Sequence, residues 1–155
     1  MNNFRPLPLV AIILGAIAIG TISIYGTNYM AAAGFSYLLF ILGLIFRKTR
    51  RFHVRLMATG MILDVSLVLI LELGRSAIDT ALSGKLSLVQ HSHIAFSTFA
   101  VVFYIPTFIY GLKRLKGSKV PAHRVWHIRM ALTAFTFRSL GFVTMFSLLS
   151  HVRAV

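Results

Sequence analysis

Residues 47–74 read RKTRRFHVRLMATGMILDVSLVLILELG, and this stretch sets the fold class. It opens on a cluster of basic residues and continues as a mostly apolar run. A helix needs about 20 apolar residues to cross the hydrocarbon of a bilayer. A basic cluster beside such a run is typical of a cytoplasmic membrane boundary. The stretch therefore predicts a transmembrane helix over 53–74.

Four further apolar runs have the length and composition of membrane spans. They cover residues 7–25, 29–46, 91–112 and 125–149. The first is too long for the apolar core of a signal peptide, so we expect a retained helix there. No internal repeat is evident. The sequence predicts an all-α integral membrane bundle of about five helices, forming one transmembrane domain over 1–155.

The charge composition supports lipid as the surrounding solvent. Charged residues make up 12% of the chain, against about 25% in a typical soluble domain. Lys and Arg number 16 against 3 acidic residues, and the basic residues lie in short clusters between apolar runs. This placement favours a topology signal over nucleic-acid binding. Counting the clusters places the N-terminus in the cytoplasm and the C-terminus outside.

Three histidines mark the basic ends of the third and fifth spans. His53 opens one span, and His123 and His127 open the other on a shared helical face, because they are four residues apart. If these two spans are neighbours, the three imidazoles can meet. Imidazole suits haem iron, copper or zinc. The alternative is that these histidines bond to water and lipid headgroups at the membrane interface.

A second group of polar residues is expected at the opposite face. His91 and His93 are two residues apart and point to different helix faces, and His93 lies deeper. A contact between His93 and Glu72 would make a small metal or proton site. Glu72 could instead pair with Arg75, one turn later on the same helix.

Two charges are expected near the middle of the membrane. Asp64 follows His53 by eleven residues, and Arg138 follows His127 by eleven. At a rise of ~1.5 Å per residue, both lie roughly 16 Å from the histidine level. A charge at this depth is costly and needs a reason. We predict that Asp64 and Arg138 form a buried ion pair.

Three short motifs carry a resemblance. His53-Val-Arg-Leu-Met57, then Ser87-Leu-Val-Gln-His-Ser-His93-Ile-Ala95, then His123-Arg124 followed by Gly141 resemble a small multi-helix bacterial membrane family. That family includes the CtaM-type assembly factors of haem–copper cytochrome oxidase. The resemblance implies an inner (cytoplasmic) membrane, a respiratory setting, and His53, His93 and His123 as the matching histidines.

The chain departs from that family at one position. The family tends to carry a further histidine at the outer end of the span that begins at His53, where this chain reads Leu71-Glu72-Leu73-Gly74. A four-histidine site would need Glu72 as a substitute. The segment His123-Arg-Val-Trp-His-Ile-Arg129 also resembles a second bacterial membrane family with an H-x-x-W-x-I-R motif.

These observations leave four functions open, of which the fourth is a proton or ion pathway through Asp64, Arg138 and Glu72. The first is a respiratory-chain accessory or assembly protein that binds haem b, copper or another metal through histidines. The second is a b-type haem subunit that exchanges electrons with quinone, and the third is a cofactor-free structural subunit of a larger membrane complex. The lipid bilayer and other respiratory subunits are the expected partners. No nucleophile–base arrangement or phosphate loop indicates an enzyme acting alone.

Overall fold

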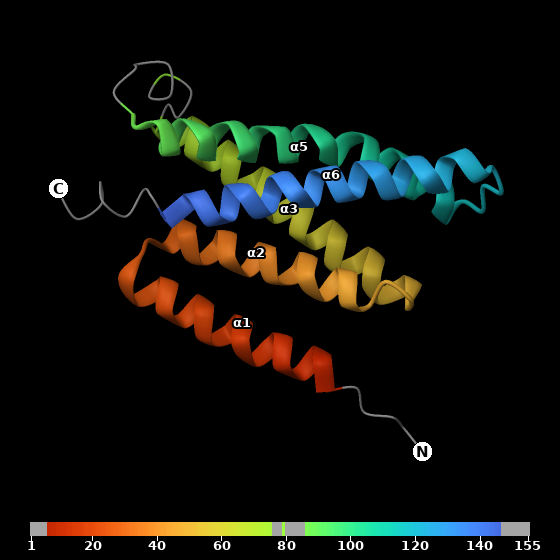
Figure 1. Cartoon of the computed structure of the whole chain (residues 1–155), viewed down its shortest axis with the longest axis horizontal. Coiled ribbons are helices and arrows are strands. Elements are labelled where there is room, and N and C mark those ends of the chain that lie inside the picture. Colours follow the sequence, from red (N-terminus) through yellow and green to blue (C-terminus); the bar gives the residue numbers. More distant parts are fainter. Residues whose placement is uncertain (1–5, 76–78, 80–85, 147–155) are drawn as a thin grey trace. The chain divides into compact units, whose positions relative to one another are not determined.

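The computed structural model describes residues 6–75, 79 and 86–146, with the backbone alone described at Pro6, Tyr25, Glu72, Gly74 and Arg75. These residues form no strand and five helices, which are α1 (Pro6–Tyr25), α2 (Asn28–Ile45), α3 (Arg50–Arg75), α5 (Leu88–Leu115) and α6 (Pro121–Met145) (Figure 1). The predicted all-α class is confirmed.

Four of these helices are long and apolar enough to cross a membrane. They are α1, α2, α3 and α5, each with an apolar window of at least 18 residues. They indicate a membrane protein in contact with lipid. α6 is not among the four, since Arg124, Arg129 and Arg138 lower its apolar character. A fifth span therefore stays a prediction.

The chain divides into two compact units. The first contains α1, α2 and α3, and the second contains α5 and α6. A single transmembrane domain stays a prediction.

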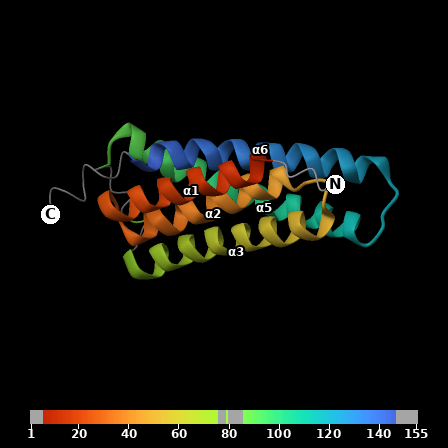
Figure 2. The same ribbon diagram turned by 90° about the horizontal axis from the view of Figure 1, so that it is seen from below.

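In the first unit, α2 packs against both α1 and α3 (Figure 2). Phe40 of α2 is 2% exposed. Gly60 of α3 lets this ring approach, because a Cβ on Gly60 would lie 3.1 Å from it. Small residues commonly permit such close helix contact in membranes. By contrast, α1 exposes large apolar side chains along its length, such as Leu7 and Ile17 at 61% each.

In the second unit, α5 and α6 form an antiparallel hairpin closed by residues 116–120. The ring of Phe137 on α6 lies 5.3–6.2 Å from three phenylalanine rings of α5. Gly117 takes a φ of +86° in the turn, a conformation that suits glycine. Gly141 faces Ser97, whose Oγ would lie 2.9 Å from an added Cβ.

Three helices begin three or four residues earlier than their apolar runs predict. α3 begins at Arg50, α5 at Leu88 and α6 at Pro121. Ser87 and Gln90 form a capping box at the start of α5, and Pro121 occupies the first turn of α6. Both devices stabilise a helix start regardless of hydropathy. The polar stretch 75–90 and the predicted helix end at 149 lie largely outside the described residues.

Candidate functional site

His53 of α3 is tied to the end of α2. Its Nδ1 lies 2.8 Å from the carbonyl oxygen of Gly43. A carbonyl can only accept, so the imidazole Nδ1–H is the donor. α2 ends at Ile45, and the last four carbonyls of a helix lack partners within it. The histidine therefore satisfies a backbone group that the helix end leaves open.

His127 of α6 makes the equivalent contact in the second unit. Its Nδ1 lies 3.1 Å from the carbonyl oxygen of Thr107 on α5. Gly111 leaves room for the ring, because an added Cβ there would lie 3.3 Å from Cε1 of His127. The contact joins the two helices of the hairpin beside their turn.

His93 crosses the same hairpin in the opposite direction, from α5 to α6. Its Nδ1 lies 2.8 Å from the carbonyl oxygen of Gly141. Arg138, one turn before Gly141, interacts electrostatically with this imidazole. The ring is half-buried and faces the partner helix.

These three histidines share one hydrogen-bonding pattern. In each, Nδ1–H is committed to a backbone carbonyl of a neighbouring helix. In the neutral ring this leaves the lone pair on Nε2. Imidazoles that bind metals are oriented in this way, with the second nitrogen bound to a carbonyl or carboxylate. For His53 and His93 this arrangement directs one possible ligand nitrogen, Nε2, in a fixed direction.

The remaining described histidines have other partners. Nδ1 of His123 lies 2.7 Å from the Oγ of Ser118 in the turn, and its ring centroid lies 5.9 Å from that of Tyr110. Nδ1 of His91 bonds to the carbonyl of Ser87, just before its own helix. His91 and His93 thus point to different partners, as their spacing predicts.

The two predicted mid-membrane charges are both buried, at 6% exposed each. Asp64 on α3 accepts a hydrogen bond from the Ser36 hydroxyl of α2. Ser36 is a site residue that the sequence analysis missed, and a lone serine within the apolar run of α2 was the available signal. Asp64 belongs to the first unit and Arg138 to the second, so their ion pair stays a prediction.

The described residues contain no assembled metal centre. Among the described residues, no group of three or more His, Cys, Asp or Glu side chains could hold a metal ion. The side chain of Glu72 lies outside the described residues, so its contact with His93 stays a prediction. In the structure, His53, His93 and His127 each donate a hydrogen bond to a backbone carbonyl. The sequence alone could not reveal these partners.

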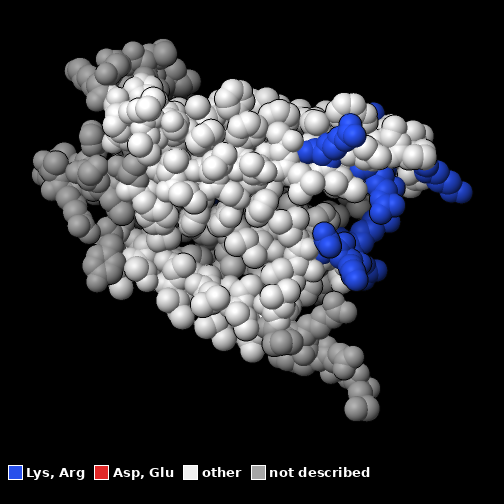
Figure 3. Space-filling view, in the orientation of Figure 1, with Lys and Arg blue, Asp and Glu red and all other residues white. Residues whose placement is uncertain are grey.

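Basic residues lie at the α2–α3 turn and at the α5–α6 turn. In the first unit they are Arg47, Lys48, Arg50 and Arg51, and in the second they are Lys113, Arg114, Lys116, Lys119 and Arg124. On the face drawn in Figure 3, blue atoms lie around these turns and the helix middles are white. Comparison with protein-family models, curated protein sequences and solved structures finds no match.

Proposed function

We propose that this chain is a respiratory-chain accessory or assembly protein of the bacterial inner membrane that binds haem through oriented histidines. The proposal includes a fifth span at α6, an N-terminus in the cytoplasm and a C-terminus outside. The basic turns after α2 and α5 support this topology, because cytoplasmic loops carry an excess of Lys and Arg. The motifs around His53, His93 and His123 support the respiratory setting.

The hydrogen bonds from Nδ1 to backbone carbonyls carry the proposal. A histidine that only fills space does not need a fixed ring direction. His53 and His127 each have Nδ1 bonded across to a neighbouring helix and lie next to a basic turn. His53, His123 and His127 are the proposed cofactor-binding histidines.

The donor set fits haem better than a bare metal ion. Haem iron needs only one or two axial imidazoles from the protein. The exposed Arg51 and Arg55 near His53 supply cations for the haem propionates. Copper or zinc bound by three protein ligands would need a cluster that the described residues do not contain. When bound, haem would supply a one-electron centre to this site.

One observation favours a second candidate, the cofactor-free structural subunit. Every described histidine has a hydrogen-bond partner within its own unit. The same contacts could serve only to fasten helices together. The b-type haem and quinone subunit remains a variant of the first proposal, with the same ligands and an electron partner.

Substitution by asparagine separates the ligand role from the fastening role. The amide N–H of Asn stands near the position of imidazole Nδ1–H, while nothing replaces Nε2. We expect the purified full-length chain to show a Soret band and a reduced α band. His53→Asn and His127→Asn should remove or shift these bands while keeping the helix content measured by circular dichroism. His53→Ala and His127→Ala, which remove the Nδ1 bond as well, should each also lose about 0.5–1.5 kcal/mol of stability, the typical value of one hydrogen bond.

His91→Asn is the matched control, because His91 bonds to a carbonyl at its own helix start. It should keep the wild-type spectrum. A wild-type protein that carries neither haem nor metal by elemental analysis, yet co-purifies with other membrane subunits, would establish the structural candidate instead.

A further inference from the structure

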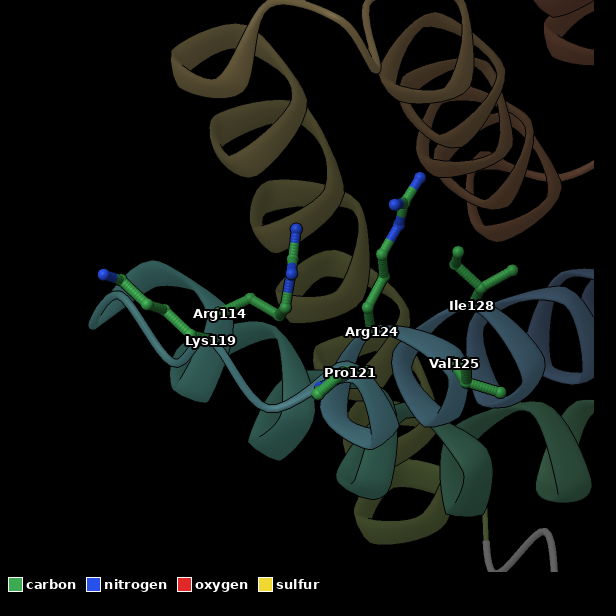
Figure 4. Close-up of a pocket in the computed structure, with 6 residues that line it drawn as sticks. All are labelled: Arg114, Lys119, Pro121, Arg124, Val125 and Ile128. Carbon is green, nitrogen blue, oxygen red and sulfur yellow. The ribbon is translucent and has the colours of Figure 1, made fainter.

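A pocket of about 470 Å³ lies at the turn between α5 and α6 (Figure 4). This volume falls within the ~300–1,000 Å³ of typical ligand pockets. All its lining residues come from the second unit, and they are Arg114, Lys119, Pro121, Arg124, Val125 and Ile128. Three are cations and three are apolar. The pocket therefore suits an amphiphilic ligand with a negative head.

The charge of this pocket is not balanced by its own hairpin. No Asp or Glu occurs between residues 86 and 146. Two neighbouring cations lie over aromatic rings, with Lys113 5.3 Å from the Tyr110 centroid and Arg129 6.0 Å from that of Trp126. Within the described part of the chain, Arg114, Lys119 and Arg124 have no carboxylate partner. An anion in the pocket would therefore meet cations that no carboxylate of this hairpin neutralises, although Figure 4 shows the Lys119 side chain extending away from those of Arg114 and Arg124.

The start of α6 adds to this field. Val120 at the N-cap makes no side-chain cap bond, and Pro121 follows in the first turn of a 25-residue helix. Pro121 has no N–H, and the N–H of His123 bonds to the carbonyl oxygen of Val120 at 3.1 Å, but the helix dipole still places partial positive charge at this end. Phosphate groups bind well at such ends. This contribution comes from the backbone and is independent of the three side chains.

The apolar residues of the pocket and the aromatic residues of its hairpin indicate the source of the ligand. Val125 and Ile128 are exposed at 46% and 45%, and they continue the pocket along α6. On the same hairpin the rings of Tyr110 and Trp126 stack, with centroids 6.4 Å apart. Such aromatic residues mark the level of lipid headgroups. A phosphate at the cations and an acyl chain along α6 match this layout.

We propose that the pocket holds a phosphate group, and that its source is the headgroup of an anionic phospholipid. Basic pockets between helices at the cytoplasmic side of membranes bind such headgroups. The site contains no histidine, so it stands or falls apart from the proposed haem ligation.

The single tryptophan of the chain, Trp126, lies within one turn of α6 from Arg124, Val125 and Ile128 of the pocket lining and reports on lipid near this turn. The full-length protein is placed in vesicles that mix a minor anionic phospholipid with a zwitterionic one. Bromine atoms, which quench tryptophan fluorescence, are carried on the acyl chains of either the anionic or the zwitterionic lipid. The surface charge is the same in both preparations. The difference in quenching therefore reports local enrichment of the anionic lipid beside Trp126.

We expect the anionic lipid to quench Trp126 well beyond its share of the membrane. The double variant Arg114→Gln/Lys119→Gln should lower this preference by about fivefold for each cation lost. The control variant Lys113→Gln/Lys116→Gln removes the same charge from the same turn, outside the pocket lining, and should change the preference by less than about twofold. Circular dichroism should show equal helix content in all three proteins.

Two results would overturn the proposal. Equal losses in the pocket variant and the control variant would show attraction by the whole turn without a defined site. Release of the anionic lipid by inorganic phosphate, but not by sodium chloride of equal ionic strength, would identify free phosphate as the ligand. If the anionic lipid stays bound in the presence of inorganic phosphate, the lipid headgroup is supported as the ligand.

Discussion

The α2–α3 and α5–α6 hairpins share one arrangement but carry opposite buried charges. In each, the second helix contains a His-Val-Arg or His-Ile-Arg triplet, beginning at His53 and at His127. Each histidine donates Nδ1–H to a carbonyl of the first helix. Eleven residues later stands a buried charge, Asp64 in one hairpin and Arg138 in the other.

The surroundings of the two charges differ. Asp64 accepts a hydrogen bond from Ser36 within its own hairpin. Arg138 instead interacts electrostatically with the imidazole of His93. This imidazole reaches from α5 to the carbonyl of Gly141 on α6. The histidine contact is thus common to both hairpins, while the sign of the charge and its support are specific to each.

The largest effect should come from removing one of the two charges. If Asp64 and Arg138 pair, Asp64→Leu or Arg138→Leu alone should cost about 3–5 kcal/mol of unfolding free energy, because the other charge is left buried. The double variant should recover much of this loss, since a hydrophobic pair can replace a buried ion pair at little net cost. Unfolding free energies in bicelles, arranged as a double-mutant cycle, measure the coupling.

Ser36→Ala is the control for that cycle. It removes only the hydroxyl that serves Asp64 and should cost about 1.5–3 kcal/mol, the range for a hydrogen bond to a charged group. Single losses that simply add in the double variant would rule out a pair.

A smaller effect should follow from giving the first hairpin the residue that the second has at the matching position. Seven residues after its key histidine, the first hairpin has Gly60 and the second has Ala134. A Cβ on Gly60 would meet the ring of Phe40 at 3.1–3.3 Å, and this buried ring has little room to move. Gly60→Ala should therefore destabilise by about 1–3 kcal/mol, as measured by thermal unfolding in detergent.

Gly20→Ala on α1 is the matched control, because nothing lies within 4 Å of a Cβ there. It should be neutral or gain about 0.5–1 kcal/mol from reduced backbone freedom. A Gly60→Ala protein as stable as the Gly20→Ala protein would show that Phe40 is not tightly held.

The smallest effect concerns the caps that begin the first helix of each hairpin. The Ser87 side chain accepts from Gln90 N–H, and Gln90 returns a 2.8 Å bond to the Ser87 N–H. Thr27 makes only the first of these contacts, at 3.3 Å to Met30 N. Ser87→Ala should cost about 1 kcal/mol and Thr27→Ala no more than that. Hydrogen exchange of the first-turn amides should accelerate more in α5 than in α2, and the reverse order would contradict the two-bond cap.

The sequence was sufficient for the helix class and for most span centres, because twenty apolar residues have few other uses. It placed the starts of α5 and α6 too late, since hydropathy does not register a capping box at Ser87 or a proline at Pro121. The histidines stood out as polar residues at helix ends. Their partners did not, because a backbone carbonyl at Gly43 or Gly141 leaves no mark in the sequence.

The sequence alone also does not identify the two shared triplets as a repeat. His-Val-Arg and His-Ile-Arg are only three residues long, and the charges that follow them have opposite signs. The match becomes visible once two hydrogen bonds align the hairpins. The hydrogen bonds of His53 and His127 show which positions of the two hairpins correspond, and a comparison of the sequences alone does not.

The exposed apolar surface of α1 has a consequence for how this protein can change over time. Lipid tails distinguish poorly among Leu, Ile and Val, so the helix is constrained by its composition and length rather than by the identity of each residue. α3 and α6 are constrained position by position, through His53, His127 and the charges that follow them. Among natural variants we expect interchange of apolar residues to accumulate freely along α1 and to be rare at those fixed points.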